Sequence, residues 1–320
     1  MKKTRICDIL HIEYPILQGG MLWLADAGLA AAVSNSGGLG VISPLAGSKP
    51  YSDAITNLGN QIDRAYELTS KPFGVNLTLD LRDVELLIDL ILTKDIKVVI
   101  TAAGDPRLFT DLFHSIGTKI FHVVSSVKQA RKAESAGVDG IIAEGVEAAA
   151  RNGYDELPLF SLIPQVVDEV AIPVIAAGGI VDSRGMVAAM SLGAEGVQLG
   201  TRFVVTNECI ANPRYKEAII AASDTDTTIT LRKLIPSRSL KTTPFTKKLL
   251  ELEQSGATPE KLKKFLGHAA SRTGGLEGDL ENGEAYCGAS AGLIKEILPV
   301  EEVMRQLING YCSVVENLSE

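Results

Sequence analysis

Ala176-Ala-Gly-Gly-Ile-Val-Asp-Ser-Arg-Gly185, followed by Gly196-Val-Gln-Leu-Gly-Thr-Arg-Phe203, is the part of the sequence that decides the fold. Each half indicates a short apolar strand that ends in a glycine turn, and a helix over 182–192 is expected to join them. Glycines at such turns let backbone N–H groups approach an anion without hindrance from a Cβ atom. Two such turns after the last two strands form the phosphate site that many β/α barrels share. We therefore expect a barrel that binds a phosphorylated ligand.

Short β-branched runs alternate with longer helical patterns upstream of these turns. This alternation is typical of βα units around a parallel sheet, and continuous apolar runs fit strands covered on both faces. The expected strands are 15–18, 38–42, 73–77, 98–101, 120–124, 140–143, 174–176 and 196–200. Further helices are expected over 24–35, 51–68, 82–93, 126–136 and 160–170. Eight such units predict a TIM (β/α)₈ barrel, with a doubly wound open sheet as the main alternative.

The pattern changes after residue 204. A helix is expected over 213–222, a polar turn over 224–228 and a Lys-rich helical stretch over 242–268, followed by a glycine-rich loop and helices near 290–297 and 300–317. We expect 1–204 together with 286–320 to form the barrel. Residues 205–285 should form a helical insertion, or lid, because barrel enzymes build substrate sites from such additions.

Composition and charge narrow the class of protein. The 320 residues are 46% hydrophobic and carry a formal net charge of −8, which argues against a general binder of nucleic acid or anionic membranes. Four dispersed cysteines (Cys7, Cys209, Cys287 and Cys312) suggest neither a disulfide framework nor a zinc site. There is no secretory signal pattern and no long apolar stretch. We expect a cytoplasmic protein with a small-molecule substrate, no nucleic-acid or membrane partner, and a homo-oligomeric assembly.

Residues at the strand ends are the candidates for chemistry, because these ends converge on one face of a barrel. The candidates are mostly neutral hydrogen-bonding groups, with no Ser/His/Asp or Cys/His set and no metal-ligand spacing. Such a site suits an enzyme whose difficult chemistry is carried by a cofactor. Together with a phosphate cradle, it points to FMN.

Several motifs resemble the nitronate monooxygenase family, formerly called 2-nitropropane dioxygenase, which includes the FMN-dependent type II enoyl-ACP reductases. They are Tyr14-Pro-Ile-Leu-Gln-Gly-Gly-Met21, Gly37-Gly-Leu-Gly40, Lys71-Pro-Phe-Gly-Val-Asn76, Ala143-Glu-Gly-Val-Glu-Ala148, the 176–180 turn and Gln198-Leu-Gly-Thr-Arg-Phe203. The resemblance runs from about residue 5 to 222 and resumes at Gly288-Ala-Ser-Ala-Gly292. It implies a barrel that holds FMN, which is reduced and reoxidised during turnover.

Matched by position, the resemblance also implies the flavin contacts. The residues that would line the flavin ring or hydrogen-bond its edge are Gln18, Gly20, Met21 and Asn76. Glu144 would approach the ring or the ribityl chain. The phosphate would be held by Gly178, Gly179, Gln198, Gly200 and Thr201, and the flavin would be covered by Gly288 and Ser290.

One departure concerns the histidine that stands beside the flavin in the family as a general base or substrate ligand. Here the segment reads Glu147-Ala-Ala-Ala-Arg-Asn-Gly153, which places Arg151 at the histidine position. An arginine stays protonated and cannot take a proton from carbon, but it can clamp an anion. The candidate catalytic residues are therefore Arg151 as an anion ligand and His122, which could face either the barrel mouth or the outer helices.

Three functions remain open. The first is oxidation of anionic nitronates through FMN and O₂. The second is reduction of enoyl-ACP substrates, with NAD(P)H as electron donor. The third is a flavin-binding protein whose catalysis has lapsed, which the missing histidine favours. Lys247-Lys248 and Lys261-Leu-Lys-Lys264 make the lid locally basic, as a solvated helix face or as a dock for an acyl carrier protein.

Overall fold

Eight parallel strands form one continuous sheet in the order β1-β9-β8-β6-β5-β4-β3-β2. A computed structural model describes residues 1, 3–49, 53–81 and 83–319 of the chain. The strands are β1 (Ile16–Gln18), β2 (Gly40–Ile42), β3 (Phe73–Thr78), β4 (Val98–Ala102), β5 (Lys119–Val124), β6 (Gly140–Glu144), β8 (Val174–Ala177) and β9 (Gly196–Leu199). An isolated parallel bridge between Leu17 and Leu39 joins the two edge strands. The predicted TIM barrel is confirmed, and the open sheet is excluded.

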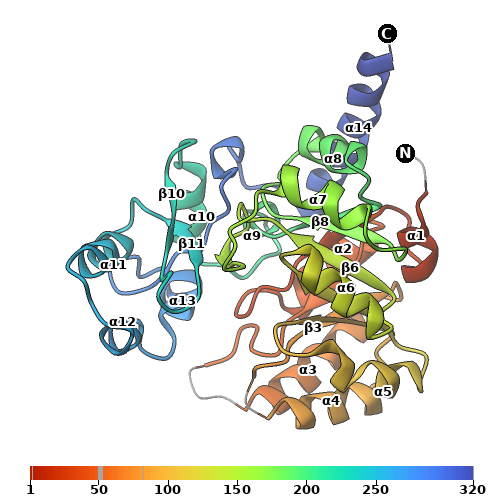
Figure 1. The fold of residues 1–320 in the computed structure, drawn as a ribbon, viewed down its shortest axis with the longest axis horizontal. Coiled ribbons are helices and arrows are strands. Elements are labelled where there is room, and N and C mark those ends of the chain that lie inside the picture. The colour runs from red at the N-terminus through yellow and green to blue at the C-terminus, as the bar shows by residue number, and fades with distance from the viewer. Residues whose placement is uncertain (2, 50–52, 82, 320) are drawn as a thin grey trace.

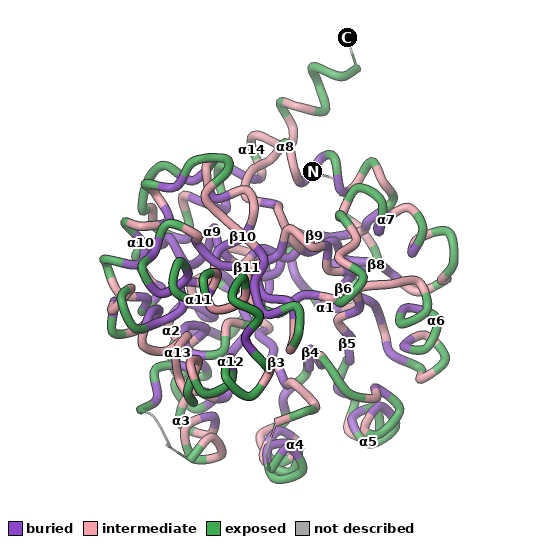
Figure 2. The backbone as a smooth tube through the Cα atoms, turned by 60° about the vertical axis from the view of Figure 1, so that its left-hand side comes forward, coloured by how far each residue is buried: buried purple, intermediate pink, exposed green. Residues whose placement is uncertain are grey.

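Helices surround this sheet (Figure 1) and turn their exposed residues outward (Figure 2). They are α2 (Ala27–Asn35), α3 (Ala54–Leu68), α4 (Val84–Thr93), α5 (Thr110–His114), α6 (Val127–Ser135), α7 (Leu159–Val167), α8 (Ser183–Ser191) and the short α9 (Thr201–Val204). Side chains of Asp26, Asp53, Ser126 and Asp182 cap α2, α3, α6 and α8 by accepting from backbone N–H groups of the first turn. These caps fix where each helix leaves its preceding loop.

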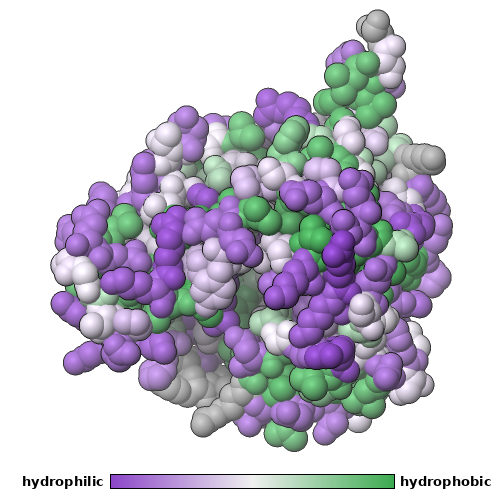
Figure 3. All heavy atoms as spheres, in the orientation of Figure 1, coloured by the Kyte–Doolittle hydropathy of each residue, from purple (hydrophilic) through white to green (hydrophobic). Residues whose placement is uncertain are grey.

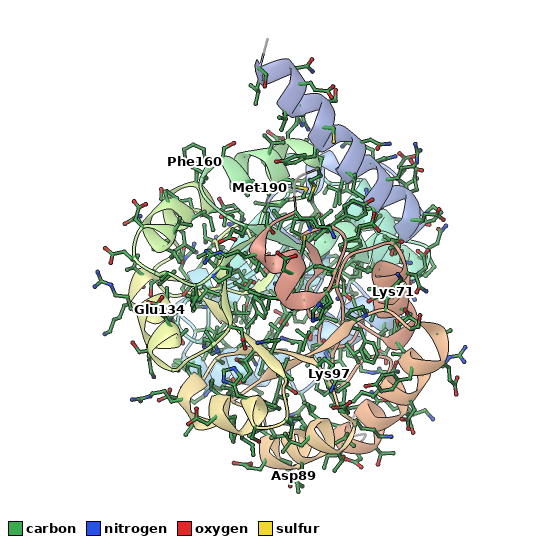
Figure 4. All side chains as sticks on the ribbon, turned by 90° about the vertical axis from the view of Figure 1, so that its right-hand side faces the viewer. Lys71, Asp89, Lys97, Glu134, Phe160 and Met190 are labelled. Atoms are coloured by element: carbon green, nitrogen blue, oxygen red, sulfur yellow. The ribbon has the colours of Figure 1, made fainter. Side chains whose placement is uncertain are left out.

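The barrel interior is a packed core that is closed at one end by α1 (Arg5–Leu10). Ile6 and Leu10 of α1 pack with Leu17, Phe121, Ile175 and other inward-facing strand residues. In Figure 4, α1 lies across this end of the barrel, while Asp89 and Glu134 lie on its outer rim. A larger cluster fills the layer between the strands and the outer helices. Because α1 closes the amino ends of the strands, a ligand has access only at their carboxyl ends.

The lid covers the carboxyl ends and lies at the left in Figure 1. It contains α10 (Pro213–Ile220), β10 (Thr227–Thr230), β11 (Ser237–Leu240), α11 (Pro244–Gln254), α12 (Pro259–Leu266), α13 (Ala270–Arg272) and the π-helical turn Thr273–Glu277. Phe245, Leu249 and Leu262 give the lid a small core of its own. The predicted helix over 213–222 contains α10, and the predicted stretch over 242–268 is two helices, α11 and α12. The β10–β11 hairpin and α13 were not predicted. The expected turn at 224–228 runs directly into β10.

A strand of two residues, β7 (Ala150–Arg151), joins the lid to the barrel. It pairs antiparallel with β11, where Arg151 lies opposite Ser237. The loop between β6 and α7 is therefore part of a three-stranded sheet whose other strands come from the lid. This pairing decides the direction of the segment in which the family histidine was expected.

The chain ends in a short 3₁₀ turn, Ala291–Leu293, and in α14 (Val300–Ser319). The first half of α14 packs on the barrel through Val300, Val303, Met304 and Leu307, whereas its last turns project from the body (Figure 1). Figure 3 shows a mostly polar face with apolar side chains gathered near this projecting end, where Val315 and Leu318 are exposed. Among the described residues, no helix is long and apolar enough to cross a membrane.

Candidate active site

A pocket lies where the carboxyl ends of β1, β6, β8 and β9 meet the lid. It encloses about 970 Å³ of space free of protein atoms, part of it open to solvent. The lid and the residue that directly follows it also contribute to the wall, through Tyr215, Ser271, Gly275, Glu284 and Tyr286.

Two glycine turns form one side of this pocket. Gly178 and Gly179 have φ angles of +101° and +70°, which favour glycine. A Cβ atom at Gly178 would lie 2.9 Å from the Gly145 carbonyl oxygen, and one at Gly179 would lie 2.9 Å from Glu147 Cβ. Within the described part of the chain, the N–H groups of Gly178, Gly179 and Gly200 donate to no protein acceptor. Unpaired N–H groups at adjacent strand ends are the arrangement expected of an anion cradle.

Most of the predicted cofactor-binding residues meet in the pocket wall. Those that line it are Gly20, Met21, Glu144, Gly178, Gly179, Gln198, Gly200, Thr201, Gly288 and Ser290. The returning segment after the lid is tied to both turns: the Gly288 N–H donates to Thr201 Oγ1 (3.1 Å), and Ser290 Oγ donates to the Gly179 carbonyl (2.6 Å). Residues 87 and 111 positions apart are thereby held in one site.

Gln18 and Asn76 lie behind this wall instead of in it. Gln18 is fully buried, and its Oε1 accepts from the Val41 N–H (3.0 Å) while its Nε2 donates to the Gly19 carbonyl. Asn76 donates from Nδ2 to the Ile100 carbonyl (3.3 Å), and its side chain occupies the space that a Cβ at Gly20 would need. Both side chains therefore support the turn after β1 from the barrel side.

The two predicted catalytic residues also lie outside the pocket wall. His122 is buried, its Nδ1 lies 2.8 Å from Thr101 Oγ1, and burial lowers the pKa of His122 to about 4. Arg151 is exposed and its Nη1 pairs with Asp80 Oδ2 at 3.0 Å, because the pairing of β7 with β11 sets its direction. Arg151 was expected to clamp an anion inside the site, but its guanidinium lies outside the pocket wall and pairs with Asp80. Among the described residues that line the pocket, there is no Lys, Arg or His.

Arg151→Ala should change the free energy of unfolding by less than about 1 kcal/mol, because the pair with Asp80 is more than two-fifths exposed on both sides. Urea denaturation of Arg151→Ala, Asp80→Asn and the double variant would measure the pair. A coupling energy above about 2 kcal/mol would show that the two side chains are shielded from water in solution and that Arg151 belongs to the interior.

The lid adds functional candidates that sequence patterns did not single out. Burial raises the pKa of Glu284 to about 7, and the Tyr286 hydroxyl donates to Glu284 Oε2 (2.9 Å). Glu144, on the opposite side, also has a pKa raised by burial to about 7. Trp23 also lines the pocket and donates from Nε1 to Ser271 Oγ (3.1 Å). The only sequence signal for Glu284 and Tyr286 is their place just before the Gly288 motif.

Comparison with known proteins shows the family to which this fold belongs. The family model described as nitronate monooxygenase matches residues 3–86 and 85–310. The chain belongs to the nitronate monooxygenase family. This confirms the resemblance seen in the motifs and makes the protein an oxidoreductase.

The chain is similar to three further proteins. The structure of FabK from Thermotoga maritima superposes with a TM-score of 0.93 at 42% identity, covering 100% of this chain and 99% of FabK. A probable nitronate monooxygenase of Staphylococcus aureus is 36% identical over 272 residues, which cover 71% of this chain and 75% of that protein. A 5-hydroxy-7a-methyl-1-oxo-octahydro-1H-indene-4-carboxyl-CoA dehydrogenase of Rhodococcus jostii is 34% identical over 242 residues. Those residues are 75% of this chain but a little under two thirds (66%) of that dehydrogenase.

Proposed function

We propose that this member of the family binds FMN in the pocket and reduces the C=C bond of an α,β-unsaturated thioester. The observation that carries the proposal is the pocket wall. It combines a phosphate cradle with two carboxyl groups whose pKa values burial raises to about 7 and, among the described lining residues, no cation. Two relatives support this substrate class. FabK is an enoyl-ACP reductase, and the Rhodococcus enzyme is named for a carboxyl-CoA substrate.

The residues present fit FMN. The unpaired N–H groups of Gly178, Gly179 and Gly200 would hold the terminal phosphate. Gln198 is buried in the pocket wall, and its Oε1 has no hydrogen-bond partner among the described residues. A buried acceptor without a partner is uncommon in a folded protein, and an N–H of a flavin ring would supply one. When bound, FMN supplies the hydride chemistry that no side chain here provides.

The protein itself supplies binding, orientation and exclusion of water. Met21, Trp23 and Ile180 give the pocket apolar surface, which favours a planar conjugated ligand and strengthens polar interactions inside. Glu144 and Glu284 are neutral below about pH 7, since burial raises both pKa values. In that state they avoid repelling the phosphate dianion and can donate hydrogen bonds to a thioester carbonyl.

Oxidation of nitronates is the second candidate, supported by the relatives named as probable nitronate monooxygenases. A nitronate is an anion, and its binding calls for a nearby cation or several free donors. The described pocket wall has two carboxyl groups and no cation, so an uncharged thioester suits it better. Arg151 does not favour an anionic substrate here, because its side chain is paired with Asp80 outside the pocket wall.

The purified protein should be yellow, and heat should release FMN instead of FAD. In anaerobic stopped-flow mixing, NADH or NADPH should bleach the flavin absorbance, and crotonyl thioesters should restore it. Crotonyl-CoA and crotonyl-ACP should be compared, because Lys247, Lys261, Lys263 and Lys264 of the lid are exposed and suit an acidic carrier protein. Bleaching by nitronates, without reoxidation by either thioester, would establish the second candidate instead. A colourless protein that FMN cannot reconstitute would rule out both.

A further inference from the structure

Four side chains form a hydrogen-bonded row along the lid side of the pocket. Trp23 Nε1–H donates to Ser271 Oγ (3.1 Å), and Ser271 shares a side-chain hydrogen bond with Tyr286. The Tyr286 hydroxyl donates to Glu284 Oε2 (2.9 Å). All four residues line the pocket. The row therefore connects the turn after β1 to the segment that returns from the lid.

Glu284 ends this row in an unusual state. Glu284 as a whole is 5% exposed, and its second carboxyl oxygen, Oε1, is buried without a hydrogen-bond partner among the described residues. An ionised carboxylate with an unpaired buried oxygen is costly, so the environment favours the protonated form. The pKa of Glu284 is accordingly raised to about 7, although the positive charge of Arg151 and the Tyr286 hydroxyl both lower it. Near neutral pH, Glu284 can thus both hold and release a proton.

The backbone around the pair is fixed from several sides. The Glu284 N–H donates to the Ala270 carbonyl (2.9 Å), and Tyr215 donates its hydroxyl to the Tyr286 carbonyl. Tyr286 also forms an antiparallel bridge with Ser239 of β11. Gly274 packs so closely on the Glu284 backbone that a Cβ atom there would overlap it. A proton donor held this firmly needs little reorganisation when it reacts.

We propose that Tyr286 and Glu284 are the proton-delivering pair of this enzyme, with the Tyr286 hydroxyl touching the substrate and Glu284 supplying the proton behind it. The inference rests on the proposed thioester reduction. In that reaction the β-carbon receives a hydride from the reduced flavin, and the C=C π bond breaks. In the structure the Tyr286 hydroxyl donates to Glu284 Oε2. For this step the hydrogen bond reverses, so that the protonated Glu284 carboxyl donates to the Tyr286 oxygen and the hydroxyl turns toward the substrate. The α-carbon then takes the proton of the Tyr286 hydroxyl, while the carboxyl proton of Glu284 moves to the tyrosine oxygen. Glu284 is left as a carboxylate and recovers its proton from water.

Tyr286 and Glu284 would supply the proton in place of the family histidine, which is Arg151 in this chain. Arg151, at the histidine position, stays protonated, and His122 lies outside the pocket wall. A tyrosine alone is a weak acid, and the pKa of Tyr286 is raised well above its ordinary value by burial and by Glu284. If both protons move together, no free phenolate forms at Tyr286. The proton that is lost overall comes from Glu284, whose pKa is about 7. Glu144 and Arg151 are the other charged groups whose influence on the pair must be separated in a test.

The first measurement needs no substrate. Infrared difference spectra of the FMN-loaded protein, labelled with ¹³C-carboxyl glutamate, should be recorded between about pH 5 and pH 9. We expect two buried carboxyl groups titrating near neutrality, of which Glu284→Gln removes one. Tyr286→Phe should shift that same component, because it loses its hydrogen bond. Glu281→Gln is the matched control, since Glu281 is an exposed residue of the same loop that pairs with Lys248. Equal spectra for the unmodified protein and Glu284→Gln would overturn the inference.

The second measurement separates the two half-reactions under anaerobic conditions. Glu284→Gln and Tyr286→Phe should slow reoxidation of the reduced flavin by crotonyl thioester by about 10²- to 10⁴-fold, the usual range for loss of a general acid. Flavin reduction and FMN affinity should stay within about threefold of the unmodified protein, as they should for Glu281→Gln. Unchanged reoxidation rates in both variants would overturn the proton-delivery role. If the unmodified protein reduces no thioester, the proposed function fails, and the infrared titration alone then supports or overturns the pair.

Discussion

Gly200→Asp should weaken FMN binding by about a hundredfold or more without unfolding the barrel. A Cβ atom at Gly200 meets no other atom within 4 Å, and the backbone there has φ −108°, so a side chain is accepted without strain. The new carboxylate would then lie in the cradle beside the phosphate dianion. A hundredfold loss corresponds to about 2.7 kcal/mol, a modest value for like charges a few ångströms apart in a partly desolvated site.

Gly200→Asn is the matched control for this result, because it adds nearly the same volume without charge. Its affinity for FMN should fall by less than about tenfold. Fluorescence titration of the apoprotein with FMN measures both affinities, and circular dichroism checks the fold. Equal affinities for the two variants would place the phosphate elsewhere. Gly179→Asp is a poorer test, since the positive φ and the contact with Glu147 would strain the backbone whatever the charge.

The barrel could be predicted from sequence because its determinants are local. Each strand is a short apolar run between a helical pattern and a turn, and strands covered on both faces need no alternation. The predicted strand at 120–124 differs from β5 (Lys119–Val124) by one residue, and the predicted helix over 126–136 contains α6 (Val127–Ser135). The glycine turns were equally visible, because positive φ angles at Gly178 and Gly179 leave few other residue types.

The lid side of the site could not be predicted because tertiary contacts create it. Glu284 is an ordinary acidic residue in a polar loop until Gly274 and Ala270 pack against its backbone and bury it. Nothing in the sequence around Arg151 shows that β7 will pair with a hairpin some eighty positions later. Position matching to the family placed Arg151 at the flavin, whereas the strand pairing turns its guanidinium toward Asp80. Similarity to the family therefore predicted the barrel and its glycine turns, but not the burial of Glu284 or the direction of Arg151.

Gly40→Ala should destabilise the barrel by about 3 kcal/mol or more. Gly40 begins β2, and a Cβ atom there would overlap the carbonyl oxygen of Ala30 in α2. Rotation of a side chain cannot relieve an overlap with backbone, so α2 would have to move away from the sheet. Its inner face carries Leu29 and Val33, both fully buried. Overpacking of a core costs about 1–3 kcal/mol when side chains can adjust, and a rigid helix backbone places this change at the upper end or beyond.

Gly59→Ala is the opposite case in the neighbouring helix and serves as the control. Gly59 lies inside α3, and a Cβ atom there meets only Leu90, at a comfortable 3.8 Å. Alanine restricts the unfolded chain more than glycine does, so this variant should gain about 0.5–1 kcal/mol. Urea denaturation followed by circular dichroism measures both. A Gly40→Ala variant as stable as the parent would mean that α2 does not rest directly on β2. In that case α2 would not hold in place the turn that precedes it, which is the turn after β1 where Asn76 lies against Gly20.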